Sequence, residues 1–237
     1  MLRRRVFLAA SLAVLTGCGA AGEANPQKVG PQGVDELTIP TPTPSLEDFV
    51  ATIDNPYLPL KPGTVWTYDV TGSEATRLEV RVQDETSTVA GVRCTVVHSL
   101  ATDADGRSVR ETYALFAQDL RGNVWTFGEY GDDRSWAAGA ADAEAGLAMP
   151  AAPRVGDGYL EERALGVAED RTTVLALDGE SSVPAGTFGD VLVVETHAEE
   201  GDRRVTRRWY AEGTGLVEAL TTLGGTEHAE LLSVTVP

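Results

Sequence analysis

Apolar and polar residues alternate with a period of two through most of the chain after residue 63. In the segment 64–70, Trp66, Tyr68 and Val70 fall on one side of an extended strand and the residues between them on the other. Such alternation is typical of a β-strand with one buried face. Similar segments follow, separated by turn sequences rich in glycine, aspartate and asparagine: 78–83, 92–100, 109–118, 124–129, 159–163, 172–177, 191–196, 205–210, 216–221 and 229–236. We therefore predict a mainly β domain built from antiparallel meanders.

Helical signals are few and short. Ser45 is followed three residues later by Asp48, as at a helix N-terminus, and the apolar residues of 46–53 fall on one helical face. The segment 137–148 is rich in alanine, which favours a weak helix. The expected fold is therefore mainly β with few short helices.

The two halves of the β region share glycine landmarks. Gly63 and Gly156 are separated by 93 residues, and so are Gly122 and Gly215. Chance agreement between common turn residues is one explanation, and an internal repeat is the other. If the repeat is real, residues 56–130 and 150–222 are related meanders that form one curved sheet or two packed sheets, because a lone sheet must bury its apolar face.

The first eighteen residues have the order of a secretory signal. Three arginines at positions 3–5 precede the apolar run Val6–Leu15, which is shorter than the roughly 20 residues needed to span a bilayer. Leu15-Thr16-Gly17-Cys18 resembles the lipobox of bacterial lipoproteins. The resemblance implies that residues 1–17 are removed and that Cys18 is acylated. It also implies export and anchoring to the outer face of the cytoplasmic membrane, whereas the alternative is an ordinary signal peptide that carries a cysteine.

Residues 18–44 are polar and small, and they end in alternating threonine and proline. Such a segment buries too little apolar surface to offset its ordering entropy, and Thr-Pro alternation favours an extended conformation. We expect a stalk between the lipidated Cys18 and a β domain at 45–237.

Composition limits the classes of partner. The formal net charge is −17 at pH 7, so nucleic acid is not expected as a partner. Membrane contact is expected only through acyl chains on Cys18, because anionic headgroups repel an acidic surface. Cys94 is the remaining cysteine, and it alternates with Val92 and Val96, which predicts a buried thiol rather than a nucleophile.

Signals for catalysis, metals and cofactors are weak. The sequence contains no nucleophile elbow, zinc-protease helix or dinucleotide fingerprint. The segment 103–106 has the composition of a hairpin turn rather than a calcium loop. The three histidines lack the close spacing of metal ligands: His98, His197 and His228. Four carboxylates are candidates for the pair that a hydrolase would need: Asp119, Glu129, Glu169 and Asp170. We predict no enzyme activity, no catalytic residue, no metal and no cofactor, with a carboxylate-dependent hydrolase as the alternative.

Aromatic residues are scarce, and five of them are candidates for a ligand-binding face. Trp66 and Tyr68 alternate in one strand and Trp125 and Phe127 in another, so each pair points to one side of its strand. The candidates are these four residues and Tyr113. A concave apolar face that receives a lipid is one interpretation. Packing in the core is the other.

The stretch Asp54–Trp66 carries a family resemblance. It resembles an uncharacterised family of exported actinobacterial lipoproteins with a DNPYxPLxPGTxW motif, as do the segments 117–125 and 183–188. A looser architectural similarity connects the chain to LolA- and LppX-like lipoprotein carriers, whose curved antiparallel sheets hold lipid. These resemblances imply an exported β protein and assign no functional residues.

We therefore predict a cell-surface lipoprotein that binds a hydrophobic or envelope ligand. A structural or protein-interaction module of the cell envelope is the main alternative. The sequence leaves the ligand and the oligomeric state open.

Overall fold

The computed structural model describes residues 44–132, 134–198 and 203–237. Of the two units into which the chain divides, residues 1–30 and 31–237, only the second contains described residues. The predicted signal peptide, Cys18 and the stalk up to residue 43 lie outside the described residues. No helix in the described ranges is long and apolar enough to cross a bilayer.

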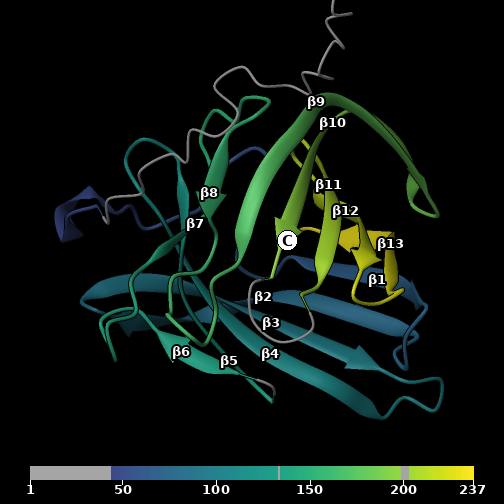
Figure 1. The fold of residues 1–237 in the computed structure, drawn as a ribbon, viewed down its shortest axis with the longest axis horizontal. Coiled ribbons are helices and arrows are strands. Elements are labelled where there is room, and N and C mark those ends of the chain that lie inside the picture. The colour runs from purple at the N-terminus through teal and green to yellow at the C-terminus, as the bar shows by residue number, and fades with distance from the viewer. Residues whose placement is uncertain (1–43, 133, 199–202) are drawn as a thin grey trace, which may run out of the picture. The chain divides into compact units, whose positions relative to one another are not determined.

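The described residues form one antiparallel sheet of 13 strands, which confirms the mainly β fold class (Figure 1). The strand order is β6-β5-β4-β3-β2-β1-β13-β12-β11-β10-β9-β8, and β7 pairs with β5 off this path. The strands are β1 (Val65–Thr71), β2 (Arg77–Val89), β3 (Val92–Thr102), β4 (Ser108–Gln118), β5 (Val124–Gly131), β6 (Ser135–Ala137), β7 (Gly146–Met149), β8 (Gly158–Leu160), β9 (Arg171–Val183), β10 (Gly186–His197), β11 (Val205–Ala211), β12 (Gly215–Leu223) and β13 (His228–Thr235).

Helical structure is less than the sequence predicts. The segment after Ser45 forms a single 3₁₀ turn, Leu46–Asp48, in which the Ser45 N–H donates to Asp48 Oδ2 at 3.1 Å. The chain then becomes extended, because Phe49 forms a β-bridge with Asp119. The helix predicted at 137–148 is wrong. Its last residues instead enter β7, whose four residues are all buried against β5, so tertiary packing overrides the helical preference of alanine.

The two meanders follow one another head to tail along the sheet. Strands β1–β5 and β8–β12 occupy it in the same order, with β13 between β1 and β12. Their entry turns also match: Gly63 N–H donates to Val82 O and Val82 N–H to Thr64 O, both at 2.9 Å. Gly156 and Asp157 make the corresponding two bonds with Val174, also at 2.9 Å. Both glycines have positive φ, 80° and 90°, a conformation that other residues adopt only with strain. A duplication that produced the two halves stays a prediction.

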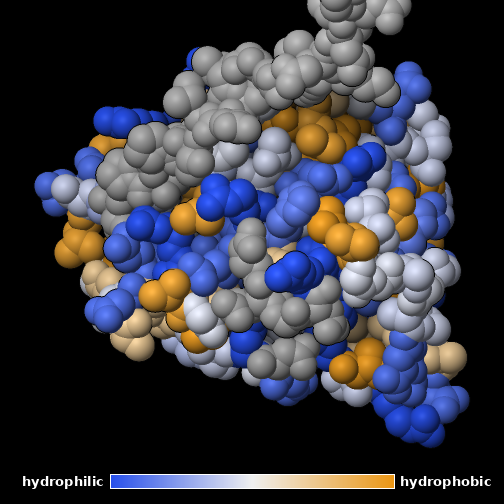
Figure 2. Space-filling model, in the orientation of Figure 1, coloured by the Kyte–Doolittle hydropathy of each residue, from blue (hydrophilic) through white to orange (hydrophobic). Residues whose placement is uncertain are grey.

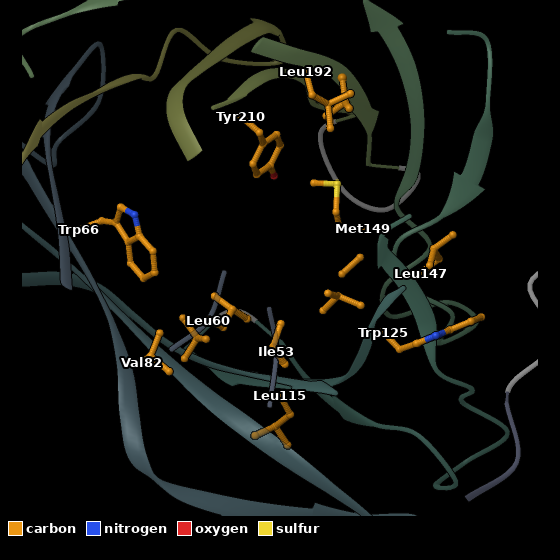
Figure 3. Close-up of a cluster of buried hydrophobic side chains, with 14 of the residues drawn as sticks. Ile53, Leu60, Trp66, Val82, Leu115, Trp125, Leu147, Met149, Leu192 and Tyr210 are labelled. Atoms are coloured by element: carbon orange, nitrogen blue, oxygen red, sulfur yellow. The ribbon is translucent and has the colours of Figure 1, made fainter. Parts of the chain in front are cut away.

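The sheet bends so that its apolar face is buried against itself. Two bonds tie the halves together: Trp66 Nε1 donates to Thr214 O at 2.7 Å, and Tyr68 Oη donates to Leu216 O at 2.9 Å. Figure 3 shows Val82 and Leu115 from one half on the side of the core opposite Leu192 and Tyr210 from the other half. Ile53 and Leu60, from the segment before β1, fill the space between them.

Asn55, in the Asp54–Trp66 motif, holds this entering segment in place. It is 2% exposed. Its backbone N–H donates to Gln118 Oε1 at 2.9 Å, and its Nδ2 donates to Gly122 O and Pro150 O at 2.9 and 3.2 Å. Its Oδ1 accepts from the Tyr57 N–H at 3.0 Å. Asn55 therefore joins the segment before β1 to the turn between β4 and β5 and to the residues after β7.

Asn55→Ala tests this role. The substitution leaves several buried backbone groups without partners, so we expect a loss of about 3 kcal/mol in the free energy of unfolding, measured by urea denaturation. Thr52→Ala, at an exposed position of the same segment, is the control and should cost less than about 1 kcal/mol. Equal effects of the two substitutions would contradict the anchoring role of Asn55.

Candidate functional site

Four of the five aromatic candidates lie in the packed core. Trp66, Tyr68, Trp125 and Phe127 are 4%, 2%, 4% and 1% exposed. The Trp125 indole donates to Asp119 Oδ2 at 3.0 Å, and Phe127 packs edge-on against Phe49 with ring centroids 5.2 Å apart. These side chains are already in contact with the protein, which favours core packing over a lipid-binding face.

Tyr113 lies apart from the other four. It is 40% exposed and stacks on His98, with ring centroids 4.6 Å apart. Its hydroxyl donates to Glu111 Oε1 at 3.0 Å, and His98 Nε2 lies 2.8 Å from the same oxygen. Val82 is buried, and Val97 and Ala114 lie on the same face of the sheet because the three residues pair across β2, β3 and β4. Tyr113 is the neighbour of Ala114 in β4, so its side chain points to the opposite face, away from the interior. The structure does not bring the five candidates together.

Paired substitutions separate the two interpretations of these rings. Trp66→Ala should lower the free energy of unfolding by about 3–5 kcal/mol, because it empties a packed site. Tyr113→Ala should cost less than about 1 kcal/mol, because its ring is partly exposed. Both are read by thermal and urea unfolding. A Trp66→Ala protein of parental stability that has lost a lipid-induced fluorescence change would support the lipid-binding face instead.

A polar cavity that is partly open to solvent lies between the two halves. Its volume is about 520 Å³, and its walls come from both halves of the sheet. Thr112 and Arg110 of β4 lie on one wall, and Thr206 and Arg208 of β11 on the other. Figure 2 shows hydrophilic and hydrophobic residues intermixed over one face of the protein.

Strand register explains why one wall is rich in hydroxyl groups. Thr172, Thr196, Thr206 and Thr221 pair in sequence across β9, β10, β11 and β12, so they form a row on the interior face. The last three of them line the cavity. Cross-strand partners share a face, so the row follows directly from the register.

Arg208 extends from this wall into a hydrogen-bonded cluster. Its Nη1 donates to Thr196 Oγ1 at 2.7 Å and to Glu161 Oε2 at 3.1 Å. Thr172 Oγ1 donates to the same carboxylate oxygen at 2.8 Å. The cluster therefore holds Arg208 in one orientation at the cavity wall.

Arg134 organises a second cluster. Its Nε donates to Glu129 Oε1 at 2.9 Å, and its Nη2 lies 2.7 Å from Glu162 Oε2. Its Nη1 lies 3.7 Å from Asp170 Oδ1. Glu162 is 6% exposed. Burial raises the pKa of Glu162 to about 8 against the opposing effect of Arg134, and the neighbouring carboxylates Asp170, Glu129 and Glu161 raise it further. Burial also raises the pKa of Asp170.

A third ion pair lies at the cavity between β4 and the turn before β13. Arg110 Nη2 and Nη1 lie 3.2 and 3.4 Å from the two carboxylate oxygens of Glu227. Burial tends to raise the pKa of Glu227, but hydrogen bonding and attraction to Arg110 lower it below its usual range. This pair fixes charge of both signs at the cavity wall.

The carboxylates singled out from the sequence divide into two groups. Glu129 and Asp170 meet around Arg134, and both line the cavity. Asp119 instead closes a turn by accepting from the N–H groups of Arg121 and Asn123, both at 2.9 Å. Glu169 accepts from the Gly166 N–H at 3.3 Å.

Sequence reasoning missed Arg134, Glu162 and Arg208. Arg208 shares one face of its strand with Thr206 and Tyr210, and Arg207 shares the other face with Trp209. Each face has one arginine and one aromatic residue, so the sequence does not show which face is buried. Arg134 and Glu162 follow no pattern, because their contact depends on how the sheet bends.

The histidines and Cys94 hold other positions. His98, His197 and His228 each lie near a different glutamate, Glu111, Glu195 and Glu218. Within the described ranges, no group of three or more potential ligands is placed to hold a metal ion. Cys94 is fully buried, as predicted, and burial raises the pKa of its thiol to about 12. The thiolate form that acts as a nucleophile is therefore disfavoured.

Comparison with known proteins shows remote structural similarity. No model of a known protein family matches the sequence, and no curated protein matches it at a significant level. A candidate exported protein with a YmcC-like fold from Bacteroides fragilis is 14% identical, with a TM-score of 0.49 over 76% of this chain and 99% of that one. A candidate lipoprotein from Parabacteroides distasonis is 12% identical, with a TM-score of 0.41 over 76% of this chain and 98% of that one. We draw no functional argument from similarity at this level.

Proposed function

We propose that this protein is an exported, lipid-anchored binding protein of the cell surface, and that its β domain binds a small hydroxyl-bearing ligand, such as an envelope saccharide. The observation that carries the proposal is the cavity of about 520 Å³. Its volume lies within the range of about 300–1,000 Å³ typical of small-molecule sites. Thr112, Thr206 and Thr221 line it, and their hydroxyl groups make no hydrogen bond to any described residue. These hydroxyls are therefore free to bind a ligand from opposite walls.

The charges of the cavity favour a neutral or zwitterionic ligand. Four arginines line it. Arg110, Arg134 and Arg208 each already form an ion pair with a carboxylate of the protein, and Arg204 is exposed to solvent. A strongly charged ligand would have to break one of these pairs and leave a partly buried charge without a partner, which is costly. A saccharide can accept from the arginines and donate to the carboxylates without separating them.

Threonine-to-valine substitutions test the cavity. Thr112→Val and Thr206→Val keep the side-chain shape and remove one hydroxyl from each wall. Each should weaken the binding of a saccharide several-fold, the usual worth of one hydrogen bond, and the double variant should weaken it by more than tenfold. Saturation-transfer NMR with a panel of neutral and acidic mono- and disaccharides selects the ligand, and titration gives its affinity.

The control is Tyr113→Ala, on the opposite face of the sheet. It should leave saccharide binding unchanged. A parent protein that binds no member of the panel, or binding that survives in the double threonine variant, would refute the cavity as a saccharide site.

The anchor is supported by the lipobox-like ending Leu15–Cys18. Cys18→Ser should abolish an acyl mass on the N-terminal residue and shift the protein from the detergent phase to the aqueous phase, because the anchoring chains are missing. Intact-mass spectrometry and detergent phase partitioning measure both effects. Cys94→Ala is the matched control and should keep the acyl mass, whereas a parent protein without acyl mass would refute the anchor.

One observation favours a second candidate, a protein-interaction module. Tyr113 and Tyr130 pair across β4 and β5, and they are 40% and 45% exposed. Exposed tyrosines are enriched at protein interfaces. Loss of a bound envelope protein in Tyr113→Ala, with saccharide binding unaffected, would identify this surface as functional.

A further inference from the structure

The two ends of the sheet meet beside the cavity without forming a strand ladder. We call this junction the seam; it comprises residues 134–149 on one side and 158–170 on the other. β7 and β8 lie side by side (Figure 1), but neither pairs with the other. An isolated bridge joins the sides, in which Glu144 N–H donates to Arg163 O at 2.9 Å. The shortest ladders between paired strands of the described sheet have three residue pairs, so the single bridge gives the seam less backbone hydrogen bonding than any of them.

Side chains supply the remaining contacts of the seam. Arg163 Nη2 lies 2.7 Å from Glu144 Oε2, next to the bridge. Trp136 and Ala143 pack against Ala164 and Ala168 in a small cluster separate from the main core. A Cβ atom at Gly146 would collide with the backbone of Glu161, so the two sides are in close contact. The seam is therefore closed, and its closure depends on side chains.

Charge is unbalanced on the inner side of the seam. Arg134 is the cation nearest to Glu162, and it faces three carboxylates: Glu129 from β5, Glu162, and Asp170 from the start of β9. Glu161 adds a further negative charge, offset by Arg208 of β11. Glu162 Oε2 and Asp170 Oδ1 are buried, and neither has a hydrogen-bond partner of good geometry. One guanidinium faces three carboxylates at short range, which favours the protonated form of one of them while the seam is closed.

We propose that the seam is a proton-controlled opening of the cavity, which stays closed while Glu162 carries a proton and parts when that proton is lost to solvent. Arg134 and Asp170 belong both to the seam and to the cavity wall, and Glu129, the partner of Arg134, also lines the cavity, so parting the seam widens the cavity. The inference rests on the proposed ligand-binding function and adds its regulation.

The direction of the pH effect follows from proton linkage. In the closed seam the pKa of Glu162 is about 8, whereas a glutamate in water has a pKa of about 4.3. The closed form therefore binds more protons between these values, and rising pH favours the open form by up to about tenfold per pH unit. The proton on Glu162 stabilises the closed seam fully below the pKa of a glutamate in water, about 4.3, and this stabilisation is lost above about pH 8. The effect is therefore read between pH 6 and pH 9.

Hydrogen–deuterium exchange of the purified full chain at pH 6 and pH 9 tests the proposal. Rates at each pH are normalised to those of the unfolded chain. Peptides covering 144–149 and 158–163 should exchange at least tenfold faster at pH 9 than at pH 6, while peptides from β10 should not change. A seam that exchanges equally at both pH values would overturn the proposal.

Glu162→Gln gives the matched comparison. Glutamine is nearly isosteric with the protonated glutamic acid and does not titrate, so the seam should exchange at the parental pH 6 rate at both pH values. Glu144→Gln removes the exposed ion pair of the same seam and should keep the pH dependence. Faster exchange in Glu162→Gln than in the parent at pH 6 would show that Glu162 acts as an anion, and would overturn the proposal. If this variant does not fold, the pH response of the parent decides the question alone.

These measurements use no ligand. A pH-dependent seam in a protein that binds no saccharide would therefore refute only the proposed function. Saccharide binding with a seam that ignores pH would refute only the regulation.

Discussion

The constraint that shapes this structure is a single large sheet with an apolar face and no α-helix in the described residues to cover it. The sheet buries that face by bending until its two halves meet. Trp66 and Tyr68 complete the junction, because each donates a hydrogen bond to the backbone of the opposite half. Core, cavity and seam all follow from this bend.

The bend also explains why one interior holds both an apolar core and a polar cavity. Where large side chains such as Trp66, Leu192 and Tyr210 face inward, the halves pack without a gap. Where the same strands place Thr112, Thr206 and Arg208 inward, the halves stay apart and polar groups line the space. Further along, Arg134 and Glu162 draw the ends of the sheet together. The side chains that each strand turns inward therefore determine whether that part of the interior is a packed core or a polar cavity.

Sequence patterns predicted much of this architecture and little of the site. All eleven predicted strands are present, because alternation of the kind seen in Val92–Thr102 reports burial within a single strand. The edge strands β6 and β7 were missed, since their alanines carry no β signal and are held by packing against β5. Arg134 and Glu162 were missed because their proximity depends on residues far apart in the chain. The aromatic residues were recognised as special, but alternation alone does not separate a packed face from an open one.

The central claim is that the cavity between the two halves is where the ligand binds. The most direct measurement is a crystal structure of the protein purified gently from its own host, in which bound material is retained. We expect electron density for a hydroxyl-bearing molecule within hydrogen-bond distance of Thr112 on one wall and Thr206 on the other. A ligand bound instead on the outer face beside Tyr113, with only water in the cavity, would contradict it.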